Sequence, residues 1–450
     1  MNSKSVNPST GEVLKKIEGL GEKEVLGKIK AARIAGKSWR EVSVERRGGL
    51  IKKLASVLRK KKEVYARLMA VEMGKPVKEG RAEVEKCAWL CEYYAENASR
   101  FLKPERIKTE MKKSYVMFEP LGVVLGVMPW NFPFWQVFRC VIPALVAGNV
   151  CVVKHASNVP QCALAIEGVF NAVGFKKGVY TTVITDVKTI LKSIPWVDGV
   201  SVTGSVAAGR SIAEVAGRAG KKTVLELGGS DPFIVLEDAD LEKACEGAVK
   251  SRFLNGGQSC IAGKRFVVVE KVREEFERRV VEKIKQLKVS DPLREETDLG
   301  PLAKEEFVKI IKKQVRDALA AGGMLLYGGK EMKGAYMMPT ILTNVSSESS
   351  VYREEVFGPV FSIIPVKGEK EAVEVANNSS FGLGASVWTK DLRKGERVAT
   401  QLEAGMVFVN GIVKSDPRLP FGGVKDSGYG RELSWYGLRE FVNVKTVVIN

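Results

Sequence analysis

Three short segments of the sequence combine residue types that could carry out nucleophilic chemistry on a carbonyl group. Cys260 follows two glycines in the segment 255–260, and such a backbone can expose a thiol and direct N–H groups toward a bound oxygen. Glu226 ends an apolar, strand-like run, so partial burial should raise the pKa of its carboxyl toward the range of a general base. Asn131, between two prolines, could donate its amide to an oxyanion. We therefore expect a thiol nucleophile with a carboxylate base.

Each of these three residues also has a structural interpretation. Cys260 could be a buried cysteine after a turn, Glu226 a carboxylate at a strand end, and Asn131 a helix cap. The other six cysteines lie in apolar periodic stretches, where a small hydrophobic side chain is expected: Cys87, Cys91, Cys140, Cys151, Cys162 and Cys245. Only Cys260 has the glycine-rich surroundings that a nucleophile needs.

The scarcity of histidine limits the chemistry further. The chain has one histidine, His155, among 450 residues. Metal sites built from two or three imidazoles and relays of paired histidines are therefore excluded, and we expect no metal. A glutamate is then the natural base to pair with a thiol.

One segment has the position of a phosphate-binding loop without the usual spacing. Residues 202–209 follow an apolar strand-like run and open a helix, so Gly204 and Ser205 could meet a phosphate at a helix N-terminus. The glycine spacing is GxxxxG, and no Lys-Ser or Lys-Thr pair follows. Neither the common dinucleotide fingerprint nor a Walker loop is present.

Charge and cysteine content bear on partners and compartment. The formal net charge is +18, but lysines and arginines alternate with acids in amphipathic stretches such as Val272–Leu287 and Ala303–Val315, which is typical of solvated helix faces. We expect no nucleic-acid partner, because no nucleic-acid motif accompanies the charge. Seven cysteines without a CxxC pair favour a reducing cytoplasm. No apolar run approaches the ~20 residues of a membrane span, and the first residues lack a signal-peptide core.

The elements that must position these residues follow an α/β pattern. Helical periodicity dominates the first hundred residues, in Val44–Leu58, Lys60–Met73 and Val84–Phe101. Short apolar runs then alternate with helical ones, as in an open parallel sheet whose strands are buried on both faces. The expected strands are Leu121–Met128, Val150–Lys154, Gly178–Ile184, Gly199–Thr203 and Thr223–Leu227, and the expected helices are Phe134–Ala147, Pro160–Val173 and Val206–Gly220. A second alternation extends from Ala239 to about Gly430, which predicts two α/β domains.

Taken together, seven ordered motifs resemble those of the NAD(P)-dependent aldehyde dehydrogenases. They span nearly the whole chain: VMPWNFP (127–133), VVKHAS (152–157), VTGS (202–205), LELGG (225–229), NGGQSC (255–260), EEVFGPV (354–360) and PFGGVKDSGYGRE (420–432). The resemblance implies that the Cys260 thiolate attacks an aldehyde, that the Asn131 amide and the Cys260 N–H hold the oxyanion, and that Glu226 activates the water that hydrolyses a thioester.

The same resemblance assigns a cofactor site. Lys154 would contact the adenosine ribose, Ser205 the pyrophosphate and Glu355 the nicotinamide ribose. Further residues of this site would be Trp130, Gly204, Leu227 and Phe357. Many NAD-preferring members carry a glutamate three residues after the lysine, where this chain has Ser157. Because that acid would repel a 2′-phosphate, we predict that NADP is accepted as well as NAD.

The segments 134–140, 153–158, 225–242 and 410–441 look most like those of bacterial succinate-semialdehyde dehydrogenases. An anionic aldehyde needs a cation or hydroxyl donors, and Arg139, Ser415 and Arg418 are candidates, each of which could instead be a surface or structural residue. Other readings stay open: a dehydrogenase of another small aldehyde, a CoA-acylating enzyme, which Glu226 argues against, or a binding protein that has lost catalysis.

The resemblance also predicts a domain organisation and an assembly. Residues 1–106 and 120–227 would form a Rossmann-like cofactor-binding domain, and residues 228–430 a catalytic domain. Residues 107–119 and 431–450 would form a small β arm that pairs with a neighbour in a homodimer or homotetramer. The apolar end Val442–Asn450 agrees with this expectation, because it would be an exposed edge strand in a monomer.

Overall fold

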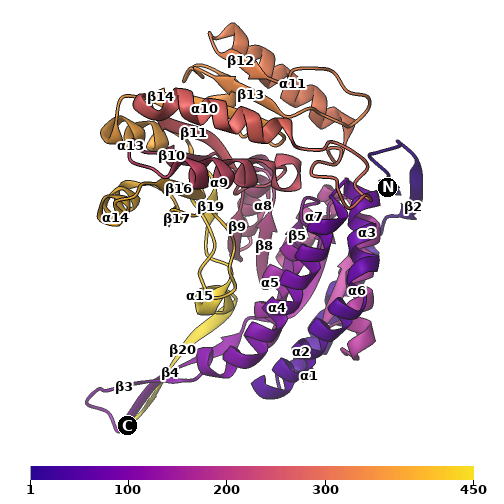
Figure 1. The fold of residues 1–450 in the computed structure, drawn as a ribbon. Coiled ribbons are helices and arrows are strands. Elements are labelled where there is room, and N and C mark those ends of the chain that lie inside the picture. The colour runs from indigo at the N-terminus through magenta and orange to yellow at the C-terminus, as the bar shows by residue number, and fades with distance from the viewer. Residues whose placement is uncertain (1) are drawn as a thin grey trace.

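The computed structural model of the chain describes residues 2–450, whose strands form two large sheets and three small ones. Figure 1 shows one α/β unit around each large sheet and a narrow projection that leaves the body of the molecule. The α/β architecture expected from the sequence is confirmed by these two sheets and by the similarity to known folds given below.

Helices dominate the N-terminal region, which starts with a hairpin of β1 (Asn2–Val6) and β2 (Val13–Glu18). Four helices follow, namely α1 (Glu22–Trp39), α2 (Val44–Lys60), α3 (Lys62–Met73) and α4 (Val77–Phe101). Ser43 caps α2 by accepting a hydrogen bond from the Arg46 N–H, and Ile51, Leu54 and Leu58 form its buried stripe. The hairpin and α1 were not predicted, and α4 begins seven residues before the expected Val84.

The six-stranded sheet positions most of the predicted cofactor residues. It has the order β19-β9-β8-β5-β6-β7 and is parallel except at β19. Its strands are β5 (Val123–Met128), β6 (Val150–His155), β7 (Tyr180–Val183), β8 (Gly199–Thr203), β9 (Lys222–Glu226) and β19 (Gly428–Tyr429). The associated helices are α5 (Trp135–Val146), α6 (Pro160–Val173), α7 (Val187–Ser193) and α8 (Val206–Arg218). Every residue of β6, β7 and β8 is buried, so helices cover both faces of this sheet.

The direction of the chain through this sheet creates a crevice. From β5 the chain proceeds outward to β6 and β7, and it then returns to β8 on the other side of β5. Open α/β sheets bind ligands at the carboxyl ends of the strands where the order reverses in this way. The segments after β5 and β8 carry Asn131 and Ser205 to that edge.

The seven-stranded sheet lies beside the predicted nucleophile. Its order is β12-β13-β14-β11-β10-β16-β17, parallel except at β12. The strands are β10 (Asp231–Val235), β11 (Gly263–Val269), β12 (Met324–Tyr327), β13 (Thr340–Thr343), β14 (Val360–Val366), β16 (Gly384–Trp388) and β17 (Met406–Val409). The helices are α9 (Leu241–Phe253), α10 (Glu270–Lys285), α11 (Glu305–Ala320), α12 (Ser350–Arg353), α13 (Glu369–Asn377) and α14 (Leu392–Gln401). Along β10, Phe233 and Val235 pack with residues of α9 and α10, and Ile234 packs with residues of α13 and α14.

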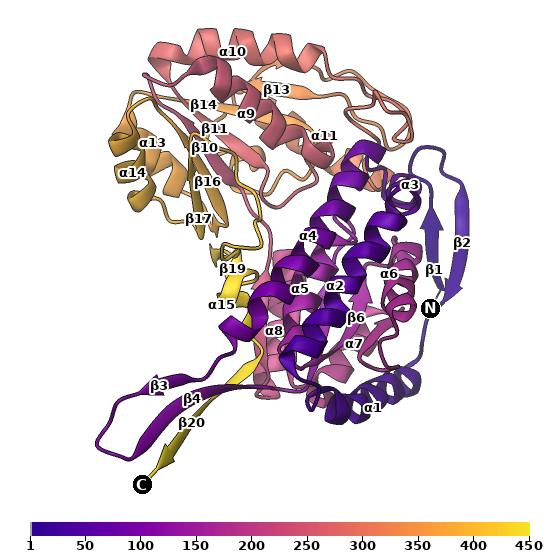
Figure 2. The same ribbon diagram turned by 60° about the horizontal axis from the view of Figure 1, so that its bottom comes forward.

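A three-stranded antiparallel sheet forms the projection visible in Figures 1 and 2. This sheet, which we call the arm, consists of β3 (Glu105–Ile107), β4 (Lys113–Pro120) and β20 (Val442–Ile449). Strands β4 and β20 lie more than 320 residues apart in sequence and pair along eight residues. Helix α15 (Ser434–Leu438) precedes β20, and β15 (Phe381–Gly382) pairs with β18 (Val424–Lys425). No helix among residues 2–450 is both long enough and apolar enough to span a bilayer.

Candidate active site

The loop before Cys260 has a backbone that only certain residues can adopt. A turn of 3-10 helix at Leu254–Gly257 follows α9, and within it Asn255, Gly256 and Gly257 have φ values of 55°, 62° and 75°. A Cβ on Gly257 would lie 2.5 Å from the Gly358 carbonyl oxygen, so only glycine fits there. This loop delivers Cys260 to a partly exposed position just before β11. The other six cysteines are buried, as predicted.

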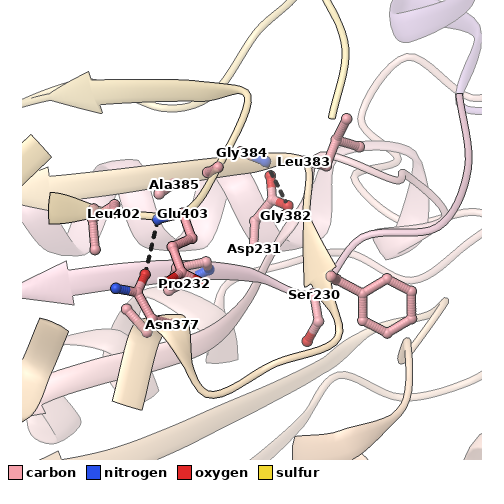
Figure 3. A pocket seen from close by; sticks show the side chains of 13 residues that line it. Ser230, Asp231, Pro232, Asn377, Gly382, Leu383, Gly384, Ala385, Leu402 and Glu403 are labelled. Atoms are coloured by element: carbon pink, nitrogen blue, oxygen red, sulfur yellow. Dashed lines mark hydrogen bonds between the residues drawn. The ribbon is translucent and has the colours of Figure 1, made fainter. Parts of the chain in front are cut away.

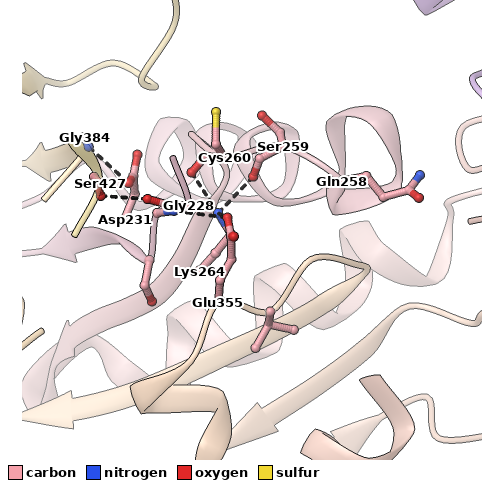
Figure 4. Close-up of polar contacts among 12 residues, drawn as sticks. Gly228, Asp231, Gln258, Ser259, Cys260, Lys264, Glu355, Gly384 and Ser427 are labelled. Atoms are coloured by element: carbon pink, nitrogen blue, oxygen red, sulfur yellow. Dashed lines mark hydrogen bonds and ion pairs between the residues drawn. The ribbon is translucent and has the colours of Figure 1, made fainter. Parts of the chain in front are cut away.

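Lys264 fixes the backbone on both sides of this cysteine. Its buried ammonium donates hydrogen bonds to the carbonyl oxygens of Ser259, at 2.9 Å, and Cys260, at 2.8 Å. It also pairs with Glu355 Oε1 at 3.1 Å, and that oxygen accepts a hydrogen bond from the Gly229 N–H. Figure 4 shows these contacts, with the Cys260 sulfur pointing away from the Lys264 ammonium. Lys264 thus connects residues 254–260, which we call the nucleophile loop, to Glu355, the carboxylate predicted to bind a ribose.

The environment of the Cys260 thiol opposes ionisation. Burial raises the pKa of Cys260 to about 12, against the lowering effect of the positive charges of Arg139 and Lys264. The negative charges of Glu355 and Glu226 act in the same direction as burial. The thiol is therefore protonated near neutral pH, and nucleophilic attack requires a base that accepts its proton.

Glu226 has the properties of such a base. It is the last residue of β9 and is 1% exposed, and neither of its carboxyl oxygens has a hydrogen-bond partner among residues 2–450. Burial holds its pKa well above the usual range, the charge of Arg139 opposes this effect, and the nearby Glu432 adds to it. A strand-end carboxylate with a structural role would accept hydrogen bonds from its neighbours, which this one does not.

Asn131 connects the loop after β5 with the nucleophile loop. Its side-chain amide donates to the Gln258 carbonyl oxygen at 3.0 Å, and the Asn255 side chain donates to the Asn131 carbonyl oxygen at 2.7 Å. The residue at the N-cap of α5 is Phe134, so Asn131 does not cap that helix. Because a side-chain amide carries two N–H groups, one N–H of Asn131 is left for the predicted contact with an oxyanion.

Aromatic side chains surround the loop after β5. Trp130 stacks on Phe307, with ring centroids 5.1 Å apart. It also forms a T-shaped contact with Phe357, with ring centroids 5.7 Å apart. Phe357 lies two residues after Glu355. The structure thus brings together three of the residues predicted at the nicotinamide end of a cofactor.

At the other end of this edge, Lys154 and Ser157 line a cavity of about 1010 Å³. Ligand pockets commonly enclose 300–1,000 Å³, so this cavity has room for an adenosine group. Lys4, Lys304 and Lys333 also line it and could meet a phosphate, although the lining includes Asp186, Glu305 and Glu306 as well. Burial lowers the pKa of Lys154, and the charge of Asp186 opposes that effect. The donor set therefore fits a phosphorylated adenosine.

The N-terminus of α8 follows β8 at the same edge of the six-stranded sheet. The exposed Ser205 caps α8 by accepting a hydrogen bond from the Ala208 N–H at 3.3 Å, and Gly204 precedes it. A Cβ on Gly209 would lie 2.4 Å from Leu227 Cδ2, so the close packing of α8 against Leu227 explains the second glycine of the GxxxxG spacing. A helix N-terminus with a serine is suited to pyrophosphate.

The three residues predicted to bind an anionic substrate have different surroundings. Arg139 is 1% exposed, forms a buried ion pair with Glu432 and packs over the Phe421 ring. Its charge is already balanced, so its geometry does not support the role of a free cation for the substrate. Ser415 is buried, and its hydroxyl accepts a hydrogen bond from the Lys86 ammonium at 2.7 Å. Arg418, the third candidate, pairs with Asp416.

A second, much smaller cavity lies at the carboxyl side of Gly229, around Asp231 (Figure 3). Its volume is about 10 Å³, the room of a single water. Asp231 accepts a hydrogen bond there from the Gly384 N–H at 3.1 Å. The size of this cavity excludes it as the substrate site.

Sequence reasoning missed three residues that the structure places in or beside the site: Lys264, Glu432 and Lys86. Lys264 could have been noticed as a charged residue inside an apolar run four positions after Cys260. Glu432 is the last residue of the motif at 420–432, and Lys86 lies outside all seven motifs. Their contacts join residues far apart in sequence, so no local spacing predicts them. Among residues 2–450, no group of three or more His, Cys, Asp or Glu side chains could hold a metal ion.

Comparison with known proteins shows extensive similarity. The model of a family described as "Aldehyde dehydrogenase family" matches residues 1–447. A Synechocystis protein named "Probable succinate-semialdehyde dehydrogenase [NADP(+)]" is 46% identical, with 99% of each chain covered. An Escherichia coli protein named succinate semialdehyde dehydrogenase [NAD(P)+] is 44% identical, over 98% of this chain and 97% of that one. The crystal structure of a Streptococcus pyogenes succinic semialdehyde dehydrogenase with NADP+ superposes with a TM-score of 0.97, at 37% identity and 99% coverage of both chains.

Proposed function

The chain belongs to the aldehyde dehydrogenase family, and from this premise we propose that it oxidises succinate semialdehyde to succinate with NADP or NAD as the acceptor. The observation that carries the proposal is the unpartnered, buried carboxyl of Glu226, whose charge acts on the thiol of Cys260. A thiol that is hard to ionise and a carboxyl that readily takes a proton have complementary properties. The names of the relatives described above specify succinate semialdehyde as the substrate and NADP or NAD as the cofactor, which supports both parts of this proposal.

The residues of the chain would perform two covalent steps. The Glu226 carboxylate takes the thiol proton, and the Cys260 sulfur bonds to the aldehyde carbon to give a thiohemiacetal. The Asn131 amide and the Cys260 N–H hold the oxyanion that forms on the aldehyde oxygen. A bound NAD or NADP would supply the acceptor for the hydride of that carbon, and this oxidation leaves a thioester on Cys260. Glu226 releases the thiol proton to solvent and then takes a proton from water. The water oxygen attacks the thioester carbon, and the C–S bond breaks to release the acid and the Cys260 thiolate, which regains a proton.

We assign the cofactor site to the edge of the six-stranded sheet. Trp130, Phe357 and Glu355 would hold the nicotinamide riboside, and Lys264 would orient the Glu355 carboxylate. Gly204, Ser205 and Leu227 lie at the N-terminus of α8 for the pyrophosphate. Lys154 and Ser157 would bind the ribose and the 2′-phosphate in the cavity described above.

We also propose a domain organisation, an assembly and a compartment for this chain. We assign cofactor binding to residues 1–106 and 120–227, and the nucleophile to residues 228–430; β19 is an exception, since it joins the first sheet from the second segment. The arm would pair with a second copy in a homodimer or homotetramer. Seven free cysteines support a reducing compartment, the cytoplasm.

The mechanism is tested with two substitutions at the reacting groups. Cys260→Ser should abolish NADPH formation from succinate semialdehyde, and measurable turnover would refute the mechanism. Glu226→Gln removes the base from both steps, so NADPH should form only slowly in a first turnover, and the reaction should then stall with one acyl group retained on the protein by intact mass. If free CoA relieved that stall, the enzyme would be a CoA-acylating dehydrogenase instead.

The cofactor prediction is tested at Ser157. Ser157→Glu places a carboxylate beside the expected 2′-phosphate, so kcat/KM with NADP should fall at least about tenfold relative to kcat/KM with NAD. Ser157→Gln is the uncharged control of the same size and should change this ratio little. An unchanged ratio in Ser157→Glu would show that the 2′-phosphate lies elsewhere.

A further inference from the structure

One face of α4 lies along the candidate site and carries charged groups at regular spacing. The Glu79 carboxylate accepts the Asn255 N–H of the nucleophile loop at 2.8 Å, and the Glu83 carboxylate accepts the N–H groups of Phe134 and Trp135, both at 2.9 Å. Lys86 lies seven residues after Glu79, or about 10 Å farther along the helix axis. The same face of α4 therefore leads from the nucleophile loop to Lys86.

Lys86 contacts two groups at the start of α5 and in the loop after β17. Its ammonium donates a hydrogen bond to the Ser415 hydroxyl at 2.7 Å and lies 4.4 Å from the centroid of the Trp135 ring. The side chain keeps some solvent exposure, although burial lowers the pKa of its ammonium to about 8. The ammonium is thus partly withdrawn from water, between the Ser415 hydroxyl and the Trp135 ring.

Lys86 forms no ion pair with any residue that the structure describes, because the neighbouring carboxylates pair with other cations. Two carboxylates are near enough to act on it, but Glu83 pairs with Lys75 and Asp416 pairs with Arg418. Arg139, which also acts on Lys86, is balanced by Glu432. Within residues 2–450 no carboxylate forms an ion pair with Lys86. A desolvated cation of this kind favours an anionic ligand, since the ligand restores the missing partner.

We propose that Lys86 is a substrate-binding residue, whose ammonium, together with the Ser415 hydroxyl, binds the distal carboxylate of a short-chain aldehyde acid while the aldehyde group lies at Cys260. This inference rests on the proposed function and names the cation that the function requires. The Trp135 ring contacts the Lys86 ammonium and would pack against the methylene groups between the two ends of such a substrate. In this arrangement the Arg139–Glu432 pair shapes the site without binding the carboxylate by itself.

The test compares an anionic aldehyde with a neutral one in the intact enzyme. Lys86→Met keeps the length of the side chain and removes its charge, Lys86→Arg keeps the charge, and Lys53→Met makes the same change at an exposed position of α2. The readout is the ratio of kcat/KM for succinate semialdehyde to kcat/KM for butanal. We expect Lys86→Met to lower this ratio about 10- to 100-fold through KM, as for loss of a charge-assisted hydrogen bond, with Lys86→Arg much closer to the unmodified enzyme and Lys53→Met unchanged.

A pH series provides a readout that a structural role would not affect. The charged and titratable groups that face Lys86 are Glu83 and Cys87 on α4, Arg139 on α5, and Asp416 in the loop after β17. Because the pKa of Lys86 is lowered to about 8, its charge is present at pH 7 and is lost as the pH rises through 8. KM for succinate semialdehyde should therefore rise above pH 8 relative to KM for butanal. In Lys86→Arg this rise should be absent.

The outcomes separate this inference from the proposed function. If the unmodified enzyme oxidises butanal as efficiently as succinate semialdehyde, the anionic substrate is overturned before any variant is made. If the unmodified enzyme prefers succinate semialdehyde and Lys86→Met keeps that preference, Lys86 is not the cation and only this inference is overturned. The inference is supported if Lys86→Met melts at the same temperature as Lys53→Met and has a lower ratio of kcat/KM for succinate semialdehyde to kcat/KM for butanal.

Discussion

At the level of single residues, Lys264 holds together groups that the chemistry requires at the same time. Its three contacts are two carbonyl oxygens of the nucleophile loop and the carboxylate of Glu355. The first two fix the backbone on which the Cys260 N–H is mounted, and the third orients a group expected to hold a ribose. Its charge also lowers the pKa of Cys260. One side chain thus couples the position of the nucleophile to its ionisation.

Lys264→Met should affect both functions. Loss of the charge raises the pKa of Cys260 further, so the alkaline increase of kcat/KM should move upward by about 0.5 to 1 pH unit. Release of Glu355 should raise KM for the cofactor several-fold. The pH profile and cofactor titrations measure the two effects, with Lys53→Met as the control. A pH profile identical to that of the unmodified enzyme would limit Lys264 to a structural role.

The candidate reacting residues can be predicted from the sequence, whereas the side chains that contact them cannot. Cys260, Glu226 and Asn131 could be singled out because glycine-rich or proline-flanked segments expose such side chains. Their roles remain predictions until the substitutions proposed above are made. The pairing of Arg139 with Glu432 could not be foreseen, because a contact between residues 293 positions apart depends on tertiary packing and leaves no local pattern.

At the level of elements, α4 acts as a scaffold for the site as well as a core helix. Its buried residues include Val84, Leu90 and Tyr94, while Glu79 and Glu83 accept backbone N–H groups of two active-site loops. The segment that carries these glutamates is also the one that sequence analysis left out of the helix. Gly80 and the surrounding charges hide the apolar periodicity there, whereas the packing of Gly80 against Ala66 of α3 holds it helical.

Glu79→Gln should change how stability depends on pH. Burial raises the pKa of Glu79 from 4.5 to about 7. Because the pKa in the folded state is above that in the unfolded state, its contribution is fully present below about pH 4.5 and is lost as the pH rises through 7. Glutamine keeps an acceptor oxygen for the Asn255 N–H and cannot ionise.

The free energy of unfolding of Glu79→Gln should therefore exceed that of the unmodified enzyme by about 1–2 kcal/mol at pH 8.5, with little difference at pH 5. Denaturant unfolding at the two pH values measures this, and Glu274→Gln, at an exposed position of α10, is the control. A difference that does not depend on pH would contradict the argument.

At the level of the whole molecule, the arm is the part that a single chain leaves incomplete. Strand β20 is an edge of its sheet, and Val444 and Val448 on it are 60% and 53% exposed. Figure 2 shows the arm extending away from both α/β units. An exposed apolar edge favours pairing with another chain. The sequence predicted this strand from its apolar residues, but its partner β4 is separated from it by most of the chain.

If the arm pairs with a second copy as proposed, Val444→Lys combined with Val448→Lys should convert the proposed homo-oligomer into monomers, because lysines on an edge strand oppose strand addition. Light scattering after gel filtration measures the mass. Leu392→Lys, at a position that is 68% exposed on α14, should leave the mass unchanged. Retention of the full oligomer in the double variant would place the interface elsewhere.

The single histidine has a consequence for observing this enzyme at work. His155 ends β6, and its Nε2–H donates to the Pro133 carbonyl oxygen at 3.1 Å, in the loop that also holds Trp130 and Asn131. Burial lowers its pKa to about 4, so the imidazole stays neutral over the whole working range of pH. Nitrogen-15 labelling of histidine would thus give one imidazole signal pair, free of titration, from a site beside the cofactor crevice. That signal would serve as a built-in spectroscopic reporter of cofactor binding.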